Sequence, residues 1–247
     1  MRFGSSVKQF QQISVCMVLL ISIPLLFSCQ GKREVSDEIR VGLNEKDLGG
    51  KTIMEYLRSK YGDKKLAKIT SLMLTRNQLK RIDDLSQLTN LQDLDIAANR
   101  IERIEGLSGL RSLRSLSLIQ DGITKIEGLE GLESLEVLML NHNNIKRIEG
   151  LTGLYKLRKL DLSDNNIEVI EGLEGLESLQ DFRVGGNKIR DFKGLLALKG
   201  LTESITLLSQ RNTVTPEARA ILDQVQKNNP NAKILLDKTD WGNGEGE

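Results

Sequence analysis

The sequence contains one histidine, and its neighbours are amides that could accompany a metal ion or a catalytic base. His142 stands beside Asn141, Asn143 and Asn144. A metal centre needs several converging ligands at a characteristic spacing, and acid–base catalysis needs a partner that orients the imidazole. The chain has no second histidine, and neither of its cysteines is near His142 in the sequence. We therefore predict a protein without catalytic residues, metal or cofactor.

A phosphate-binding loop is the second chemistry to consider, because Gly49–Thr52 reads GGKT. Such a loop requires an earlier glycine five residues before the glycine that precedes the lysine, so that backbone amides surround the phosphates. That position is Glu45. The spacing therefore excludes the motif, and we expect no nucleotide or other small-molecule substrate.

An apolar run without charges, from Ile13 to Ser28, follows the basic residues Arg2 and Lys8. The run is short for a membrane-spanning helix and contains Pro24, whereas its length suits the core of a secretory signal. An uncleaved signal anchor is the alternative. We predict a signal peptide over residues 1–28 and a polar tether over residues 29–44.

The apolar run ends in LFSC, Leu26–Cys29. This segment resembles the lipobox of bacterial lipoproteins, which implies cleavage before Cys29 and acylation of its thiol with fatty acids such as palmitate. The other cysteine, Cys16, would leave with the signal peptide, so an intrachain disulfide is excluded. The resemblance implies a lipid-anchored protein of the bacterial cell envelope, at the outer membrane or the cell surface.

Charge and composition narrow the class of partner. The formal net charge is +1, and loss of two basic and no acidic residues with the signal peptide changes it to −1. This balance gives no reason to expect nucleic acid. Aromatic residues make up only 4% of the chain, so the core must be aliphatic.

The chain then repeats itself every 22 residues, with six leucine-rich segments in step. Each segment alternates as x-L-x-L-x, which predicts a short strand with its leucines on one face. A return segment G-L-x-x-L follows, and two leucines three apart suit a 3₁₀ turn. A single coil cannot bury its leucines, so stacking of the coils must supply the core. The segments start at Ile69, Leu91, Leu113, Leu135, Leu157 and Leu179.

This pattern resembles the leucine-rich repeat, in the 22-residue form found in bacterial internalins and in a eukaryotic phosphatase-regulatory subunit. The resemblance spans Leu66–Leu208. It implies an α/β leucine-rich-repeat solenoid with a parallel sheet on the concave face and short 3₁₀ or turn segments on the convex side. We predict the repeats over residues 67–208.

One asparagine per repeat forms a column, and an amide that donates and accepts can bridge neighbouring coils. The third repeat carries Asp121 instead, and an ionised carboxylate cannot donate. We therefore predict a structural ladder with a weak point or altered loop at Asp121. The members of the ladder are Asn77, Asn99, Asn143, Asn165 and Asn187.

Helical caps are expected at both ends of the solenoid. Thr52 and Glu55 have capping-box spacing, which predicts a helix within an N-terminal cap over residues 45–66. Pro216 after Thr215 predicts a second helix. It would lie within a C-terminal cap over residues 209–238, followed by a disordered tail over residues 239–247.

Two further details concern the C-terminal end. The segment KILL, from Lys233, could form a final strand. A seventh repeat begins before it but loses register, because Ser204 and Thr206 fall at leucine positions.

Two columns of opposite charge flank the strands, and we interpret them as a solvated flank in preference to a binding stripe. The acidic column is Asp83, Glu105, Glu127, Glu149 and Glu171. The basic column is Arg81, Arg103, Lys125 and Arg147.

The outward strand positions vary while the scaffold positions repeat, which is typical of a shared scaffold with a particular surface. Ile119, Val137 and Met139 predict an exposed apolar patch on the concave face, with scattered surface residues as the alternative. The predicted partner-binding residues are Ile119, Val137, Met139, Asn141, Lys159, Asp161 and Arg183.

Together these features predict a non-enzymatic, membrane-anchored module that binds a protein through its concave face, such as a surface adhesin or host-interaction lipoprotein. A periplasm-facing envelope scaffold and a regulatory subunit of an enzyme are the alternatives.

Overall fold

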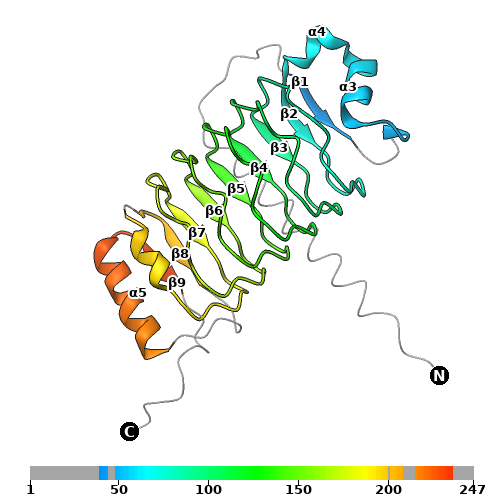
Figure 1. Cartoon of the computed structure of the whole chain (residues 1–247). Helices are drawn as coiled ribbons and strands as arrows, with labels where there is room; N and C mark the ends of the chain where they lie inside the picture. The colour runs from blue at the N-terminus through cyan, green and yellow to red at the C-terminus, as the bar shows by residue number, and fades with distance from the viewer. Residues whose placement is uncertain (1–38, 44–47, 200, 208–214, 236–247) are drawn as a thin grey trace, which may run out of the picture. The chain divides into compact units, whose positions relative to one another are not determined.

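The computed structural model describes residues 39–43, 48–199, 201–207 and 215–235. Nine strands lie side by side in one sheet, in chain order from β1 to β9 (Figure 1). Every neighbouring pair is parallel. Between successive strands the chain returns to the same edge of the sheet before it forms the next parallel strand. The chain therefore winds as a solenoid. This confirms the predicted parallel solenoid.

The elements are short, as coils of this size require. The strands are β1 Ile39–Gly42, β2 Ile69–Met73, β3 Asp93–Asp95, β4 Ser115–Ser117, β5 Val137–Met139, β6 Lys159–Asp161, β7 Asp181–Arg183, β8 Ser204–Thr206 and β9 Lys233–Leu235. The helices are α3 Ile53–Tyr61, α4 Asp63–Leu66, the 3₁₀ helix η1 Lys193–Ala197 and α5 Pro216–Asn228.

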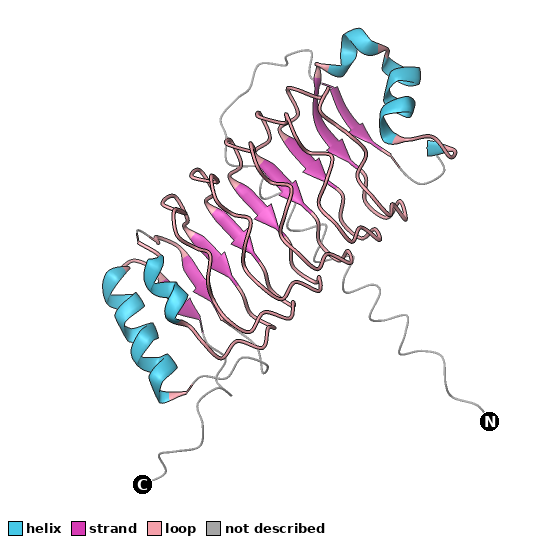
Figure 2. Ribbon diagram, viewed as in Figure 1, coloured by secondary structure: helices cyan, strands magenta, loops and turns pink. Residues whose placement is uncertain are grey.

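The core is a continuous aliphatic stack between the sheet and the return segments. In β5 and just after it, Leu138 and Leu140 have no exposed surface, and their equivalents in neighbouring coils are equally buried. The return segments are single turns closed by i→i−3 bonds, such as Leu132 N to Leu129 O at 3.2 Å. Only the last one, η1, extends to a 3₁₀ helix among the described residues (Figure 2). Repeated aliphatic burial at about 25 cal/mol per Å² is what stabilises the stack.

Glycine in the return segment has a steric reason as well as a conformational one. Gly128 has φ +67°, and a Cβ there would overlap the carbonyl oxygen of Ile104 in the preceding coil. The equivalent glycines Gly106, Gly150 and Gly172 behave in the same way. The turn at each of these glycines is therefore also a point of close approach between backbones.

The chain before the first repeat contributes to the sheet, which corrects part of the predicted tether over residues 29–44. Ile39–Gly42 forms strand β1, parallel to β2. Val41 and Leu43 are buried in the common core. The physical reason is alternation: these two apolar residues are separated by one position and so point to the same face of a strand.

Strand β8 forms although the 22-residue register is lost there, as expected from Ser204 and Thr206 at leucine positions. The structure pairs Phe182 of β7 with Ile205 of β8, so the spacing from β7 to β8 is one residue longer than the regular repeat. Ile205 and Leu207 are buried, while Ser204 and Thr206 lie on the other face. A slip of one residue would have reversed these faces, and burial of the apolar pair selects the longer spacing.

Helices lie beyond the first and last regular repeats. Helix α3 begins with the predicted capping box between Thr52 and Glu55, and Gly62 ends it with φ +72°. Helix α5 begins with Thr215 as N-cap and Pro216 in its first turn. Both helices bury apolar side chains in the core, including Leu57 and Leu222. The predicted final strand is confirmed as β9. Cys29, the predicted signal peptide of residues 1–28 and the predicted tail of residues 239–247 lie outside the described residues.

Candidate functional site

The sheet face that points away from the core, here called the outer sheet face, brings the predicted binding residues together. Strand register places Val137 beside Lys159 and Met139 beside Asp161. The next strand places Arg183 beside Asp161. Ile119 and Asn141 follow β4 and β5 in equivalent positions. The predicted residues therefore form a contiguous area across four neighbouring coils.

The apolar side chains of this area are less exposed than the sequence predicts. Ile119, Val137 and Met139 are half-buried instead of exposed, because neighbouring strands bring the adjacent side chains against their flanks. Met73 on β2 is the more exposed apolar residue of the outer sheet face, at 40%. These three half-buried residues do not form a protruding patch. We call them the apolar step.

Beside this step lies an ion-pair network centred on Asp181, which is not among the predicted partner-binding residues. Asp181 is buried, and Arg183 donates to it from Nε at 3.1 Å and approaches it with Nη2 at 3.0 Å. Lys159 Nζ is 3.5 Å from the same carboxylate, and the Ser204 hydroxyl donates to Oδ1 at 2.8 Å. The two cations are thereby held in place before any partner arrives. No sequence signal distinguishes Asp181 from other outward aspartates, because its partners come from three strands.

Asp161 lies beside the network and is also buried. Its Oδ1 accepts a hydrogen bond from the backbone N–H of Ser163 at 3.0 Å. Burial raises the pKa of Asp161, and the hydrogen bonds from Ser163 and the charges of Arg183 and Lys159 oppose this rise. The site thus carries two positive side chains, one well-compensated carboxylate and one carboxyl with a raised affinity for its proton.

The column of asparagines bonds neighbouring coils through its side-chain amides. Asn143 is buried, donates to the carbonyls of Leu118 at 2.7 Å and Leu140 at 3.0 Å, and accepts from Ile123 N–H at 3.1 Å. Asn165 and Asn187 repeat this pattern one and two coils later. One side chain thus joins two coils and closes the loop of its own coil.

His142 occupies a position with a backbone requirement. Its φ is +59°, and the equivalent residues Ala98, Gln120 and Asp164 have φ between +55° and +59°. The sixth equivalent position is a glycine, Gly186. The imidazole Nδ1 is 3.6 Å from Asp164 Oδ2, with both side chains about half exposed. Arg76, with φ +59°, is the first member of this left-handed column. The sequence pattern did not reveal the column because six different residue types occupy its six positions.

Asp121 replaces the ladder asparagine without altering the loop. Its Oδ1 accepts from Asn99 N–H at 3.0 Å and Ile101 N–H at 3.3 Å, as an amide oxygen would. The preceding residue, Gln120, has φ +58°, so the predicted altered loop is not present. Its Oδ2 is buried and has no hydrogen-bond partner in the described part of the chain. Burial is the largest cause that raises the pKa of Asp121, to about 7.

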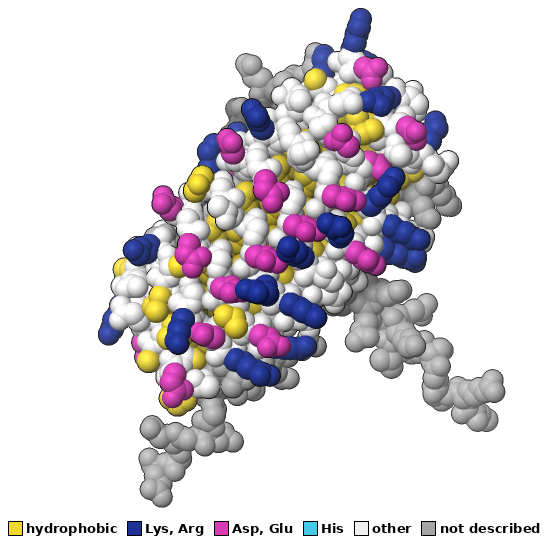
Figure 3. Space-filling model, viewed as in Figure 1, with side chains coloured by type: hydrophobic (Ala, Val, Ile, Leu, Met, Phe, Trp, Pro, Cys, Tyr) yellow, Lys and Arg dark blue, Asp and Glu magenta, His cyan; other side chains and the backbone are white. Residues whose placement is uncertain are grey.

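The charged columns alternate along the coils, and Figure 3 shows Lys and Arg interleaved with Asp and Glu. Arg103 Nε is 2.9 Å from Glu127 Oε1, and Arg147 Nε is 2.9 Å from Glu171 Oε1. Each of these arginines thus pairs with the acid of the next coil. The side chains of the basic partners are largely exposed, which fits the predicted solvated flank.

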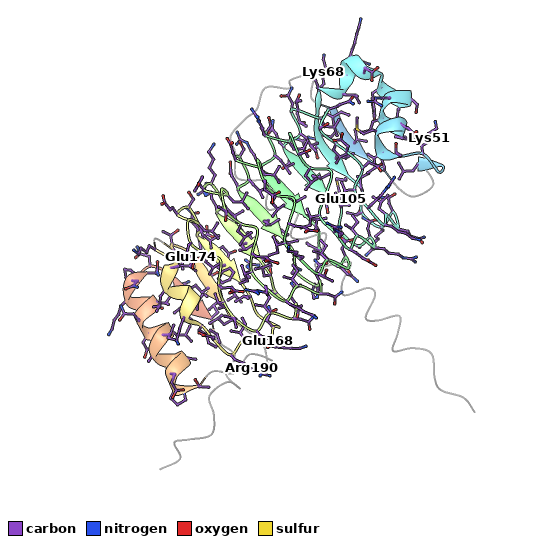
Figure 4. The ribbon with its side chains drawn as sticks, viewed as in Figure 1. Lys51, Lys68, Glu105, Glu168, Glu174 and Arg190 are labelled. Atoms are coloured by element: carbon purple, nitrogen blue, oxygen red, sulfur yellow. The ribbon has the colours of Figure 1, made fainter. Side chains whose placement is uncertain are left out.

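The loops that follow the ladder continue the coil-to-coil bonding at one edge. Glu168 and Arg190 lie close together on successive coils there, whereas Glu105 belongs to the acidic column (Figure 4). The backbone N–H of Arg190 donates to the carbonyl of Glu168 at 2.9 Å.

Among the residues that the structure describes, no group of three or more His, Cys, Asp or Glu side chains is placed to hold a metal ion. Within those residues, no helix combines the length and apolar character needed to cross a membrane.

Stacked parallel strands, single-turn returns and an asparagine ladder define the class of repeat scaffolds that present a sheet face. The family model described as leucine rich repeat matches residues 65–123, 124–167 and 134–189, about half of the chain. The chain belongs to the leucine-rich repeat family. None of the curated protein sequences compared with it matches.

Solved structures of two internalins from Listeria monocytogenes str. 4b F2365 share the fold. The structure of inlF has a TM-score of 0.61 and 24% identity, covering 76% of this chain and 53% of that chain. The structure of internalin C2 has a TM-score of 0.51 and 24% identity, covering 70% of this chain and 74% of that chain.

A third similar structure is TLR13 in a complex with ssRNA13. Its TM-score is 0.60 at 28% identity, covering 69% of this chain and 26% of that chain. This chain therefore spans about half of the inlF chain and about a quarter of the TLR13 chain.

Proposed function

We propose that this chain is a non-enzymatic, lipid-anchored protein of the bacterial envelope that binds another protein through its outer sheet face. The observation that carries the proposal is the apolar step of Ile119, Val137 and Met139 beside the cations that Asp181 holds in place. None of these outward side chains is needed for the leucine core. An apolar centre with a polar rim is typical of protein-binding surfaces.

The charges of the outer sheet face favour a protein over a polyanion. Asp93 and Asp95 on β3 and Asp161 on β6 lie on the same face as Lys159 and Arg183. Binding of nucleic acid draws on unopposed cations that neutralise phosphates. A mixed surface instead suits a partner with both apolar and charged side chains.

Anchoring rests on the sequence alone, through the segment Leu26–Cys29. Metabolic labelling with a fatty acid is expected to label the wild-type chain and not Cys29→Ser. Persistence of the label in the variant would remove the argument for the envelope. Protease treatment of intact cells then separates a surface protein, which is cut, from a periplasm-facing scaffold, which is protected.

The binding face is tested by a photo-crosslinking residue placed at Met139 in the native envelope. The matched control carries it at Tyr155, a 61% exposed side chain in the return segment of the same coil. We expect a discrete adduct from position 139 and none of that size from position 155. The same adduct from both positions would contradict the proposed face.

Once the crosslinked partner is identified and purified, alanine substitution of Ile119, Val137 and Met139 together is expected to weaken binding by about 100-fold or more, since central apolar contacts dominate interface energetics. The control, Met73→Ala, removes an apolar side chain from the same sheet face three coils away from Met139 and should leave the affinity unchanged. Unchanged affinity in the triple variant would show that the site lies elsewhere.

A further inference from the structure

The backbone carbonyls that accept hydrogen bonds from the asparagine ladder show how many bonds each ladder residue, or rung, donates. Leu140 O lies between two regular rungs, and it accepts from Asn143 Nδ2 at 3.0 Å and from Asn165 Nδ2 at 3.0 Å. Leu162 O likewise accepts from Asn165 at 3.0 Å and Asn187 at 2.9 Å. Each amide donates within its own coil, to the carbonyl three residues earlier and more weakly to the one two residues earlier, and donates once to the coil before. A carbonyl between two asparagine rungs therefore receives two bonds.

The carbonyls on either side of Asp121 each receive one ladder bond instead of two. Ile96 O accepts from Asn99, and Leu118 O accepts from Asn143 at 2.7 Å. By the spacing of the other rungs, these are the two carbonyls toward which the second oxygen of Asp121 is directed. That oxygen, Oδ2, is buried and has no partner among the described residues. An ionised Oδ2 would be a third hydrogen-bond acceptor beside these two carbonyl oxygens and could donate to neither. Burial of unsatisfied acceptors makes this arrangement costly.

We propose that Asp121 stands in the ladder as a neutral carboxylic acid, whose Oδ2 hydroxyl donates to the carbonyl of Ile96 or Leu118, and that loss of this proton loosens the third coil. A carboxylic acid has one donor where the amide has two, so it restores one of the two missing bonds. Oδ1 continues to accept from Asn99 and Ile101, as an amide oxygen does. The third coil is thus a position where the folded structure holds a proton.

The groups around Asp121 agree with a retained proton. On the preceding coil, Asp95 has its own buried and unpaired Oδ2, and its negative charge adds to the rise in the pKa of Asp121. The stem of Glu102 lies near Gly122. On the following coil, His142 stands next to the ladder residue Asn143, and its imidazole Nδ1 is 3.6 Å from Asp164 Oδ2. Backbone N–H groups of Ile101 and Asn99 oppose the rise but do not cancel the effect of burial. None of the ion pairs among the described residues supplies a cation to Asp121.

The direction of the pH dependence follows from linkage. The pKa of Asp121 is about 7 in the folded chain, above the ordinary value of 3.8. The folded state therefore binds more protons than the opened state between these limits. Stability from this group is fully present below about pH 4 and is lost as pH rises to about 7. An opening that releases one proton becomes about tenfold more favourable per pH unit inside this window.

Amide hydrogen exchange of the full chain tests the proposal, read at the N–H groups of Asn99 and Ile101 and corrected for intrinsic exchange. Asp121→Asn supplies the regular ladder amide. The ratio of its protection factor to that of the wild-type chain should rise about tenfold per pH unit between about 5 and 7, then level off. The control Asp164→Asn changes an exposed carboxylate of the left-handed column and should leave the wild-type slope intact. A ratio that stays constant from pH 5 to 8 would overturn the proposal.

A measurement on the unmodified chain is independent of the variant. The side-chain carboxyl carbon of Asp121, followed by ¹³C NMR, should titrate near neutrality and carry its neutral chemical shift at pH 5. Titration of this carbon near pH 4, together with the exposed aspartates, would overturn the proposal even if Asp121→Asn stabilised the chain.

Discussion

The carboxylate of Asp83 accepts a hydrogen bond from the backbone N–H of Ile53, with 2.7 Å between Oδ2 and nitrogen. Thirty residues separate the two positions. Ile53 opens helix α3, so Asp83 satisfies an N–H that the helix itself cannot pair and places negative charge at its N-terminus. The first member of the acidic column thereby ties the N-terminal helix to the first repeat.

Replacement of Asp83 by alanine should therefore lower the free energy of unfolding by about 1 to 2 kcal/mol, the range for loss of a helix-capping acceptor. Chemical denaturation measures this change. Glu105→Ala is the matched control, because Glu105 holds the same repeat position one coil later and is exposed. Equal losses in the two variants would mean that the column, and not the contact with Ile53, sets the stability.

The fold was predictable where the determining interactions repeat locally. Leu138 and Leu140 predict a strand with one buried face, because the alternation of apolar and other residues can be read from neighbouring positions. The contact of Asp83 with Ile53 has no such local signal, and neither does the network around Asp181. The register of β8 depended on whether Ile205 or Ser204 was buried, which only the stacked coil decides. For the predicted partner-binding residues, the sequence indicated one common sheet face, where the structure places them, but it overestimated the exposure of Met139.

The second prediction concerns the contribution of the asparagine ladder to stability. Asn143→Ala removes donors to the carbonyls of Leu118 and Leu140 and leaves the buried N–H of Ile123 without its acceptor. We expect a loss of about 2 to 5 kcal/mol, since buried groups left unsatisfied are costly. Denaturant titration gives the value.

Asn144→Ala provides the control in the same loop. Its side chain is exposed, and its backbone N–H bond to Ile123 O does not involve the amide group. The cost should stay within about 0.5 kcal/mol. If the two alanine variants were equally stable, the ladder would not be the source of coil-to-coil stability.

A pair of glycines in one return segment separates conformational strain from steric overlap. Gly128 and Gly131 both have positive φ, +67° and +83°, but only at Gly128 would a Cβ meet the backbone of the preceding coil. Gly131→Ala should cost about 1 to 2 kcal/mol, the price of a left-handed alanine. Gly128→Ala should cost about 3 kcal/mol or more, since the overlap with Ile104 adds to that strain. Thermal or chemical unfolding of both variants measures the difference, and equal costs would mean that the coils can move apart without loss.

His142 allows the backbone requirement to be separated from any chemistry of its imidazole. Its φ of +59° suits glycine and disfavours a β-branched side chain. We expect His142→Gly to change the free energy of unfolding by no more than about 0.5 kcal/mol, because relief of strain offsets the added freedom of the unfolded chain. His142→Val should cost about 1 to 3 kcal/mol, the range for a strained backbone. Equilibrium unfolding of the two variants at the same pH gives the comparison. If valine were tolerated as well as glycine, the left-handed backbone would not be what selects the residue at this position, and the contact with Asp164 would need to explain it.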